Sequence, residues 1–431
     1  MRGQGPRARE ARACALELTH AALERAQGDA LQELGLLEDL SNYYHDDHQH
    51  AQSLQFQQRY TQLLAQVLGP NHPRVFLANV RQARLLALSG QLSQAVALME
   101  DAALRAGQVL PPHHAMRATL LTSLMYRQSA AGLLAQAERT LALLWEHLEA
   151  TTPAVSQPRF SWLVLASELA LKRGQYAQAL RYAQQALEQC GGLKLRQTNR
   201  EAWAMSHAAR ALVKLGRLRE ARVLLEQATR QIERSAGTES LEVVSYHQDM
   251  AFLREAQGDH AQALRLRQSA LERMRKVEGD QGSWMEREPM HLDVAQSLLN
   301  LGRAAEALEM LSQPVSVLRA GLGEKAPEVL QGWRLQGAAL LTLGRAAEAL
   351  PLLEKAVHEG ASSGIDPNDQ ALGRFLLARA LRETGQPPGL AAEQVQRAQE
   401  DYARADWPHR ARRAELLRWA SRHLPAQHAR R

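Results

Sequence analysis

The octapeptide LGRAAEAL occupies Leu301–Leu308 and recurs unchanged at Leu343–Leu350, 42 residues later. Its glycine belongs to a series with spacings of 42, 42, 42, 42, 44 and 42 residues: Gly90, Gly132, Gly174, Gly216, Gly258, Gly302 and Gly344. Alanine follows each of these glycines five residues later. A fixed period of this length is typical of a repeat protein, in which one supersecondary unit is stacked many times.

Each unit has the pattern of a helix hairpin. Further breaks lie 21 residues before the aligned glycines: Gly69, Pro111, Pro153, Gly237 and Gly323. Apolar residues recur at helical spacing between the breaks. We therefore predict two antiparallel helices per unit, with the reversal at the aligned glycine, which adopts positive φ without steric cost. The residue seven before the glycine is mostly small, which would let the two helices approach closely: Ala83, Ser167, Ala209, Ala251, Ala295 and Gly337.

Composition restricts the class of protein. The 431 residues include 52 basic and 46 acidic side chains, a net charge of +6, and these charges are interleaved, which argues against nucleic acid as a partner. No apolar run is long enough to span a membrane. Two distant cysteines, Cys14 and Cys190, predict neither a disulfide framework nor a thiolate zinc site. We expect a cytoplasmic protein.

The aligned positions resemble the tetratricopeptide repeat, which has a small residue in its first helix, a glycine at the turn and an alanine early in its second helix. The usual unit has about 34 residues, and a 42-residue unit adds about one turn to each helix. With LGPNHPRV at Leu68–Val75, the longer period is similar to kinesin light chains and related bacterial repeat arrays. The resemblance implies an all-α, right-handed superhelical solenoid. The aromatic residue expected eleven positions before the glycine occurs only as Trp333.

The resemblance covers residues 28–402, about nine units. The first unit is expected to turn at Asp46, five residues before Ala51, and the last at Gly385. Residues 1–27 are predicted to be a basic N-terminal segment and capping helix, and residues 403–431 a C-terminal capping helix and basic tail. Arg275–Arg287, which holds the two-residue insertion, is expected to form a longer loop.

Two segments are candidates for chemistry. HDDHQH at His45–His50 could supply metal ligands, but it falls on a predicted turn, so an exposed polar turn and a metal site both remain as interpretations. GASSG at Gly360–Gly364 matches G-x-S-x-G, yet it follows a predicted helix rather than a strand. We predict no catalytic, cofactor-binding or metal-binding residue, and no cofactor.

A binding surface is the remaining candidate. In a tetratricopeptide solenoid the first helix of each unit lines a concave groove, which places residues two, three, six, nine and ten before the glycine inside it. The unit at Trp203–Lys214 combines a histidine and two cations at these positions with Trp203 one helical turn before His207, which predicts a preference for acidic peptides with an apolar anchor. Ordinary packing or solvated side chains are the alternative interpretation. The predicted peptide-groove residues are Arg81, Arg84, Tyr126, Lys172, Trp203, His207, Arg210, Lys214, Gln248, Gln296, Asn300 and Arg334.

The pattern therefore favours a non-catalytic scaffold that binds protein or peptide partners. The alternative is a regulatory or sensor subunit of a signalling system, such as a Ser/Thr kinase or a transcription regulator whose catalytic or DNA-binding part is on another chain. An enzyme acting through the His45–His50 segment is a third hypothesis. Nothing in the sequence predicts the oligomeric state.

Overall fold

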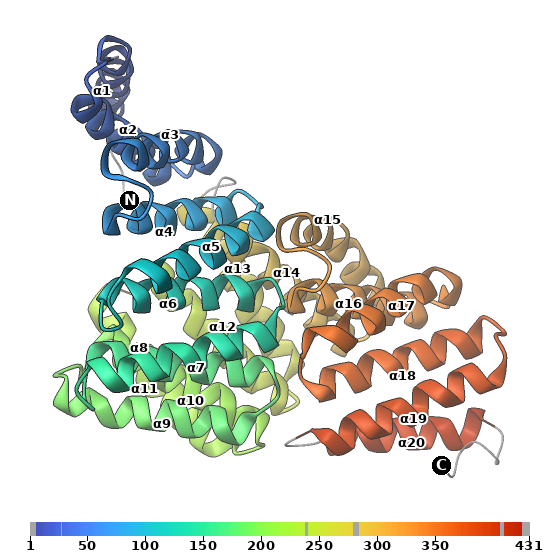
Figure 1. Ribbon diagram of the computed structural model, residues 1–431. Coiled ribbons are helices and arrows are strands. Elements are labelled where there is room, and N and C mark those ends of the chain that lie inside the picture. The colour runs from blue at the N-terminus through green and yellow to red at the C-terminus, as the bar shows by residue number, and fades with distance from the viewer. Residues whose placement is uncertain (1–5, 27, 238–239, 279–283, 406–408, 425–431) are drawn as a thin grey trace.

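The structure, a computed structural model, describes residues 6–26, 28–237, 240–278, 284–405 and 409–424 (Figure 1). These residues form helices and no strand. The helices are α1 (Pro6–Arg25), α2 (Ala30–Asp46), α3 (His50–Leu68), α4 (Pro73–Leu88), α5 (Leu92–Val109), α6 (Ala115–Ala130), α7 (Leu134–Thr151), α8 (Gln157–Lys172), α9 (Tyr176–Gly192), α10 (Asn199–Lys214), α11 (Leu218–Ala236), α12 (Leu241–Ala256), α13 (His260–Glu278), α14 (Trp284–Asn300), α15 (Ala304–Leu322), α16 (Pro327–Thr342), α17 (Ala346–Ser363), α18 (Pro367–Glu383), α19 (Pro388–Arg404) and α20 (Arg410–His423).

The helices pack as consecutive antiparallel hairpins. In the part of the chain that the structure describes, nine hairpins run from α2–α3 to α18–α19, with α1 before them and α20 after them. We call the even-numbered helices α2 to α18 the A helices and their partners α3 to α19 the B helices. The predicted all-α solenoid of about nine hairpins is confirmed.

The aligned glycines close the A helices as their positions predict. All seven, and Gly385 as well, have φ between 72° and 83°, in the left-handed region. At Gly344 the following residue, Arg345, donates its N–H to the carbonyl of Leu340 over 2.8 Å. This 6→1 hydrogen bond satisfies a carbonyl at the helix end, as in a Schellman motif. Glycine is therefore required here by the backbone, whatever binds nearby.

The small residues form the contact between the two helices of a hairpin. The Ser167 hydroxyl of α8 donates to the carbonyl of Ala179 in α9 over 2.9 Å. A Cβ on Gly337 of α16 would overlap Leu353 of α17. The seven aligned alanines are fully buried: Ala95, Ala137, Ala179, Ala221, Ala263, Ala307 and Ala349.

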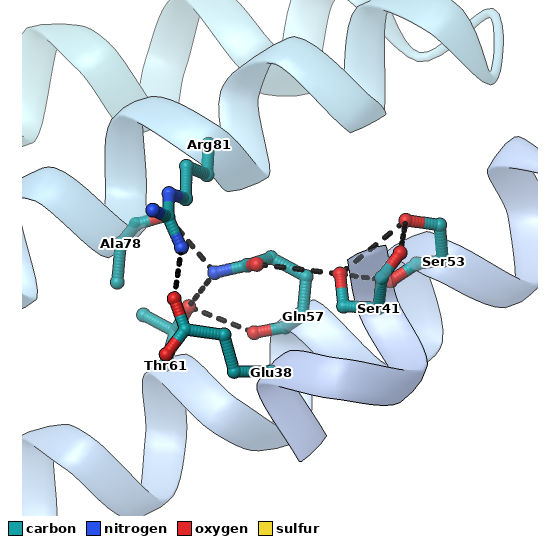
Figure 2. Close-up of polar contacts among 7 residues, drawn as sticks. All are labelled: Glu38, Ser41, Ser53, Gln57, Thr61, Ala78 and Arg81. Carbon is teal, nitrogen blue, oxygen red and sulfur yellow. Dashed lines mark hydrogen bonds and ion pairs between the residues drawn. The ribbon is translucent and has the colours of Figure 1, made fainter. Parts of the chain in front are cut away.

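The first unit turns at His48, so the expectation of Asp46 is wrong. His48 has φ 58° and lies 42 residues before Gly90, in register with the later units. Ser53, five residues on, replaces the usual alanine and is fully buried. Its hydroxyl donates to the carbonyl of Ser41 over 2.7 Å, across the contact between α2 and α3 (Figure 2). A serine can occupy the small-residue position because this hydrogen bond satisfies its hydroxyl.

The expected loop at Arg275–Arg287 is also mostly helical. Helix α13 continues to Glu278 and α14 begins at Trp284, while residues 279–283 lie outside the described part. An ion pair between Lys276 and Glu272, one helical turn apart at 3.0 Å, stabilises the end of α13, which has 19 residues like α11 and α15. Helix α14 has 17 residues, one more than α12 and α16.

The row of units curves until distant units touch. The A helices pack directly on one another, as α8 does on α10 and α10 on α12, which places them on the inner side of the curve. The indole N–H of Trp284 donates to the carbonyl of Leu88 over 2.7 Å, and the N–H of Asp366 donates to the carbonyl of Lys172 over 3.1 Å. We call this contact the inter-turn interface. One side consists of residues 88–90, 132–134 and 172–176, and the other side of residues 284, 321–328 and 364–367. Figure 1 shows how α15–α18 come beside the units from α5 to α9.

Candidate functional site

The twelve predicted groove residues all lie on A helices, from α4 to α16, but they differ in accessibility. Trp203, Gln248, Gln296, Lys172 and Arg334 are half-buried. His207 is buried, with 3% of its surface exposed. The exposed members are Arg81, Arg84, Tyr126, Arg210, Lys214 and Asn300.

Polar contacts between neighbouring A helices cross the inner face. Arg210 of α10 is 3.7 Å from the carboxylate of Asp249 in α12, and the Ser206 hydroxyl donates to the same carboxylate. In the first units, Arg81 of α4 forms an ion pair with Glu38 of α2 (Figure 2). Groove residues of adjacent units thus bind one another and fix the relation between units.

The same pattern continues in the later units. The Asn300 amide donates to Glu255 over 2.6 Å, and Arg334 of α16 lies 3.2 Å from Asp369 of α18. Lys172 of α8 is 3.7 Å from Glu328 of α16, across the inter-turn interface. Four predicted groove cations, Arg81, Lys172, Arg210 and Arg334, are therefore paired with carboxylates of other helices.

Aromatic rings contact both Lys214 and His207 of α10. The Lys214 ammonium lies over the rings of Tyr176 and Phe252, at 5.6 and 5.5 Å from their centroids. The rings of Trp203 and His207 meet edge to face at 5.6 Å. Burial lowers the pKa of His207 to about 4, so the imidazole is neutral at pH 7. Among the predicted groove residues of α10, the positive charge at pH 7 is therefore carried by Arg210 and Lys214.

Two carboxylates between neighbouring A helices, those of Asp249 and Asp293, have raised pKa values. Burial raises the pKa of Asp249 and that of Asp293, although Arg210 opposes the shift at both. Burial, with the nearby Glu168, raises the pKa of the Tyr126 hydroxyl to about 12. The interior of the curve is therefore a partly dehydrated polar surface, in which charge pairs act more strongly than they would in water.

Arg267 belongs to this surface although it lies on a B helix. Its guanidinium is 4% exposed, is 2.5 Å from Glu255, and donates to the Ser297 hydroxyl over 2.6 Å. The sequence holds a signal for it, because the position nine residues after the aligned glycine is apolar in the other units: Met99, Leu141, Ala183, Leu225, Leu311 and Leu353. A charge at a core position indicates a buried polar network.

The structure does not assemble a metal site or a hydrolase elbow from the described residues. The rings of His45 and His50 are 5.6 Å apart, but no group of three or more His, Cys, Asp or Glu side chains there could hold a metal ion. The GASSG segment ends α17, where the Ser363 hydroxyl donates to the carbonyl of Gly360 over 3.0 Å. Helix replaces the strand that an elbow needs.

Comparison with known families assigns the repeats. Residues 170–236, from the end of α8 through α11, match the family model "Tetratricopeptide repeat". This part of the chain has the pattern of tetratricopeptide repeats. A search of curated proteins gave no match. None of the described helices of this repeat array combines the length and the apolar character that a membrane crossing requires.

Solved structures resemble the repeat array at low sequence identity. A Rap protein in complex with Competence and Sporulation Factor has a TM-score of 0.51 at 13% identity and covers 80% of this chain and 97% of its own. A kinesin light chain from Podosopora anserina with nearly identical TPR-like repeats has 0.41 at 21%, covering 48% and 98%. BtubC (BKLC) from P. vanneervenii has 0.40 at 16%, covering 55% and 91%. These likenesses concern the fold.

A cleft lies at the C-terminal end of the repeat array. It has a volume of about 500 Å³, and its lining includes Phe375 and Arg379 of α18 and Trp419 of α20. The rings of Phe375 and Trp419 are 5.7 Å apart. Phe375 and Arg379 occupy groove positions, ten and six before Gly385, that the sequence prediction did not include because the turn of this unit is irregular. The inner face therefore extends to α20.

Proposed function

We propose that the tetratricopeptide repeat array is a non-catalytic scaffold that binds protein or peptide partners along the inner face of its A helices. The observation that carries the proposal is the chain of polar side chains on that face, where Arg84, Tyr126, Arg210 and Lys214 remain exposed. Exposed side chains on a rigid, curved surface suit the recognition of an extended segment, in which a few aromatic or arginine contacts dominate the affinity.

The fold supports this proposal in general terms. Repeats of this family are generally non-catalytic scaffolds. The Rap protein that shares the fold was determined with Competence and Sporulation Factor bound, so an array of this architecture accommodates a partner. The preference for acidic partners is part of the proposal, and it rests on Arg84 and Lys214, which lack a carboxylate within ion-pair distance in the described part of the chain.

A peptide-array screen tests the proposal. The wild-type chain is compared with Arg81→Glu/Arg84→Glu, with Arg210→Glu/Lys214→Glu and with the control Arg303→Glu/Arg345→Glu. The control reverses as many charges at exposed turn positions. Among the described residues, Arg303 and Arg345 form ion pairs only with Glu306 and Glu348, in the first turns of the helices that follow them. We expect the first two variants to lose acidic peptides and the control to keep them. Equal binding by all four proteins would contradict the acidic preference.

Affinity capture from a lysate tests the scaffold itself. Partners retained by the wild type and by the control, but released by both inner-face variants, would support binding through the A helices. Partners retained by all variants would place the working surface elsewhere on the array.

A further inference from the structure

Arg127 of α6 stands where the other units have small or apolar residues. Its position, five before the aligned glycine, is filled elsewhere by Leu85, Leu169, Ala211, Leu253, Ser297 and Ala339. The Arg127 side chain is half-buried and its Nε atom is buried without a hydrogen-bond partner. A guanidinium withdrawn from water at a packing position destabilises the fold unless an anion compensates it.

The charges around Arg127 increase the cost of burying its guanidinium. Burial lowers the pKa of its guanidinium, and the nearby positive charge of Arg84 in α4 acts in the same direction. Among the described residues, no carboxylate forms an ion pair with Arg84 or Arg127, and the neighbouring Tyr126, with a pKa of about 12, is neutral at pH 7. Helices α4 and α6 pack directly on one another, and they bring the positive charges of Arg84 and Arg127 to the same part of the inner face.

Two histidines of the first unit complete the group. The rings of His45 and His50 are 5.6 Å apart at the α2–α3 turn, and Arg84 lowers the pKa of both. Burial and the neighbouring cations lower the pKa of His50 to about 4, and each histidine has a buried Nδ1 without a partner. The ring of His48 lies 6.1 Å from that of His50, and the Asp46 carboxylate acts to raise the pKa of His45 against the larger effect of burial. We call His45, His50, Arg84 and Arg127 the basic cluster.

We propose that the basic cluster is a binding site for a phosphoryl group. Two guanidinium ions carry two permanent positive charges, and a phosphoryl group carries about −1.5 to −2 at pH 7 with three acceptor oxygens, so one such group neutralises the pair. A single carboxylate would leave one charge uncompensated. The two histidines, neutral at this pH, each hold one N–H that can donate to the remaining oxygens.

The site does not depend on the proposed scaffold function, because inorganic phosphate alone is the first probe. The melting temperature of the full chain is measured with phosphate and with chloride at equal ionic strength, and the dissociation constant of phosphate by calorimetry. We expect phosphate to raise the melting temperature of the wild type. No effect of phosphate beyond that of chloride would overturn the proposal.

Substitutions locate the site. Arg127→Leu introduces the residue that three other units carry at this position, so in chloride it should melt at or above the wild-type temperature while losing the response to phosphate. Arg84→Gln, at an exposed position, should weaken phosphate binding at least about tenfold, the factor that one lost charge-assisted hydrogen bond represents. Arg345→Gln is the matched control and should respond as the wild type does. If Arg127→Leu and Arg84→Gln respond to phosphate as Arg345→Gln does, phosphate binds elsewhere and the proposal is wrong.

A second comparison identifies the source of the phosphoryl group. Peptides that carry phosphoserine are measured against their serine counterparts and against inorganic phosphate. Tighter binding of the phosphopeptide than of inorganic phosphate or of the serine peptide, dependent on Arg127, would support a phosphorylated side chain as the ligand. Equal binding of phosphate and phosphopeptide would support the site with a free phosphate as its ligand.

Discussion

The turns at Gly132 and Gly302 have the same place in the repeat and nearly the same backbone, with φ of 73° and 76°, yet their surroundings differ. A Cβ on Gly132 would overlap the carbonyl of Lys325 in the inter-turn interface, whereas a Cβ on Gly302 would have no described atom within 4 Å. Gly174 resembles Gly132, because a Cβ there would meet the Asp366 carboxylate, and Gly344 resembles Gly302. Glycine thus allows the local turn in every unit, and in some units it also allows a close contact with a distant unit.

The interface around Gly174 also uses residues that the other units lack. Tyr176, two residues later, is buried and donates its hydroxyl to Asp366. Asp366 also accepts the N–H of Asn368 over 2.9 Å and so caps α18. Lys214, beside the Tyr176 ring, lowers the pKa of Asp366 against the larger effect of burial, which raises it. The contact thus joins three helices from two turns of the superhelix.

Among these substitutions, Gly132→Ala should cause the largest loss of stability, because this turn lies in the inter-turn interface. We expect a loss of about 4 kcal/mol in the free energy of unfolding, because the Cβ is strained in the left-handed region and also forces the Lys325 backbone away. Hydrogen exchange should become faster at the start of α16, in peptides covering residues 322–330. Unchanged exchange in these peptides would show that the interface does not form in solution.

Gly174→Ala should be less severe, at about 3 kcal/mol, because the atom that its Cβ meets belongs to the Asp366 side chain, which can rotate. Exchange should increase at the start of α18 rather than at α16. Denaturant unfolding measures the first effect and exchange mass spectrometry the second. A loss larger than that of Gly132→Ala would contradict this order.

Tyr176→Phe tests the polar part of the interface without backbone strain. Removing the hydroxyl that donates to Asp366 should cost about 2 kcal/mol, the range of a hydrogen bond to a charged group. The change should add to that of Gly302→Ala and should be less than additive with that of Gly174→Ala, since only the latter shares its partner. Full additivity in both double variants would argue against a common contact at Asp366.

Gly302→Ala and Gly344→Ala should give the smallest effects, about 1 kcal/mol each, from backbone strain alone. Exchange should rise only within the hairpins α14–α15 and α16–α17. Faster exchange at Leu88 or Lys172, on the other side of the interface, would show that these turns are also coupled to distant units.

Much of the fold could be predicted from the 42-residue period. Gly302, Ala307 and their counterparts determine where each hairpin turns and where its helices touch, because both demands are local. Other features were present in the sequence as exceptions to the repeat. Arg127 and Arg267 replace small or apolar residues, and His48 and Ser53 stand in for glycine and alanine in the first unit. The mistaken turn at Asp46 came from following the alanine rather than the period.

The sequence by itself determined the helical hairpin unit and, from the second unit on, the glycine at which each hairpin turns. The tertiary structure alone decided that Gly132 meets Lys325 across 193 residues, and that Arg81, Arg210 and Arg334 are already paired with carboxylates. The physical reason is that each unit contacts its neighbours through local packing, whereas the meeting of distant units depends on small rotations that accumulate from unit to unit. No short stretch of sequence predicts the total rotation.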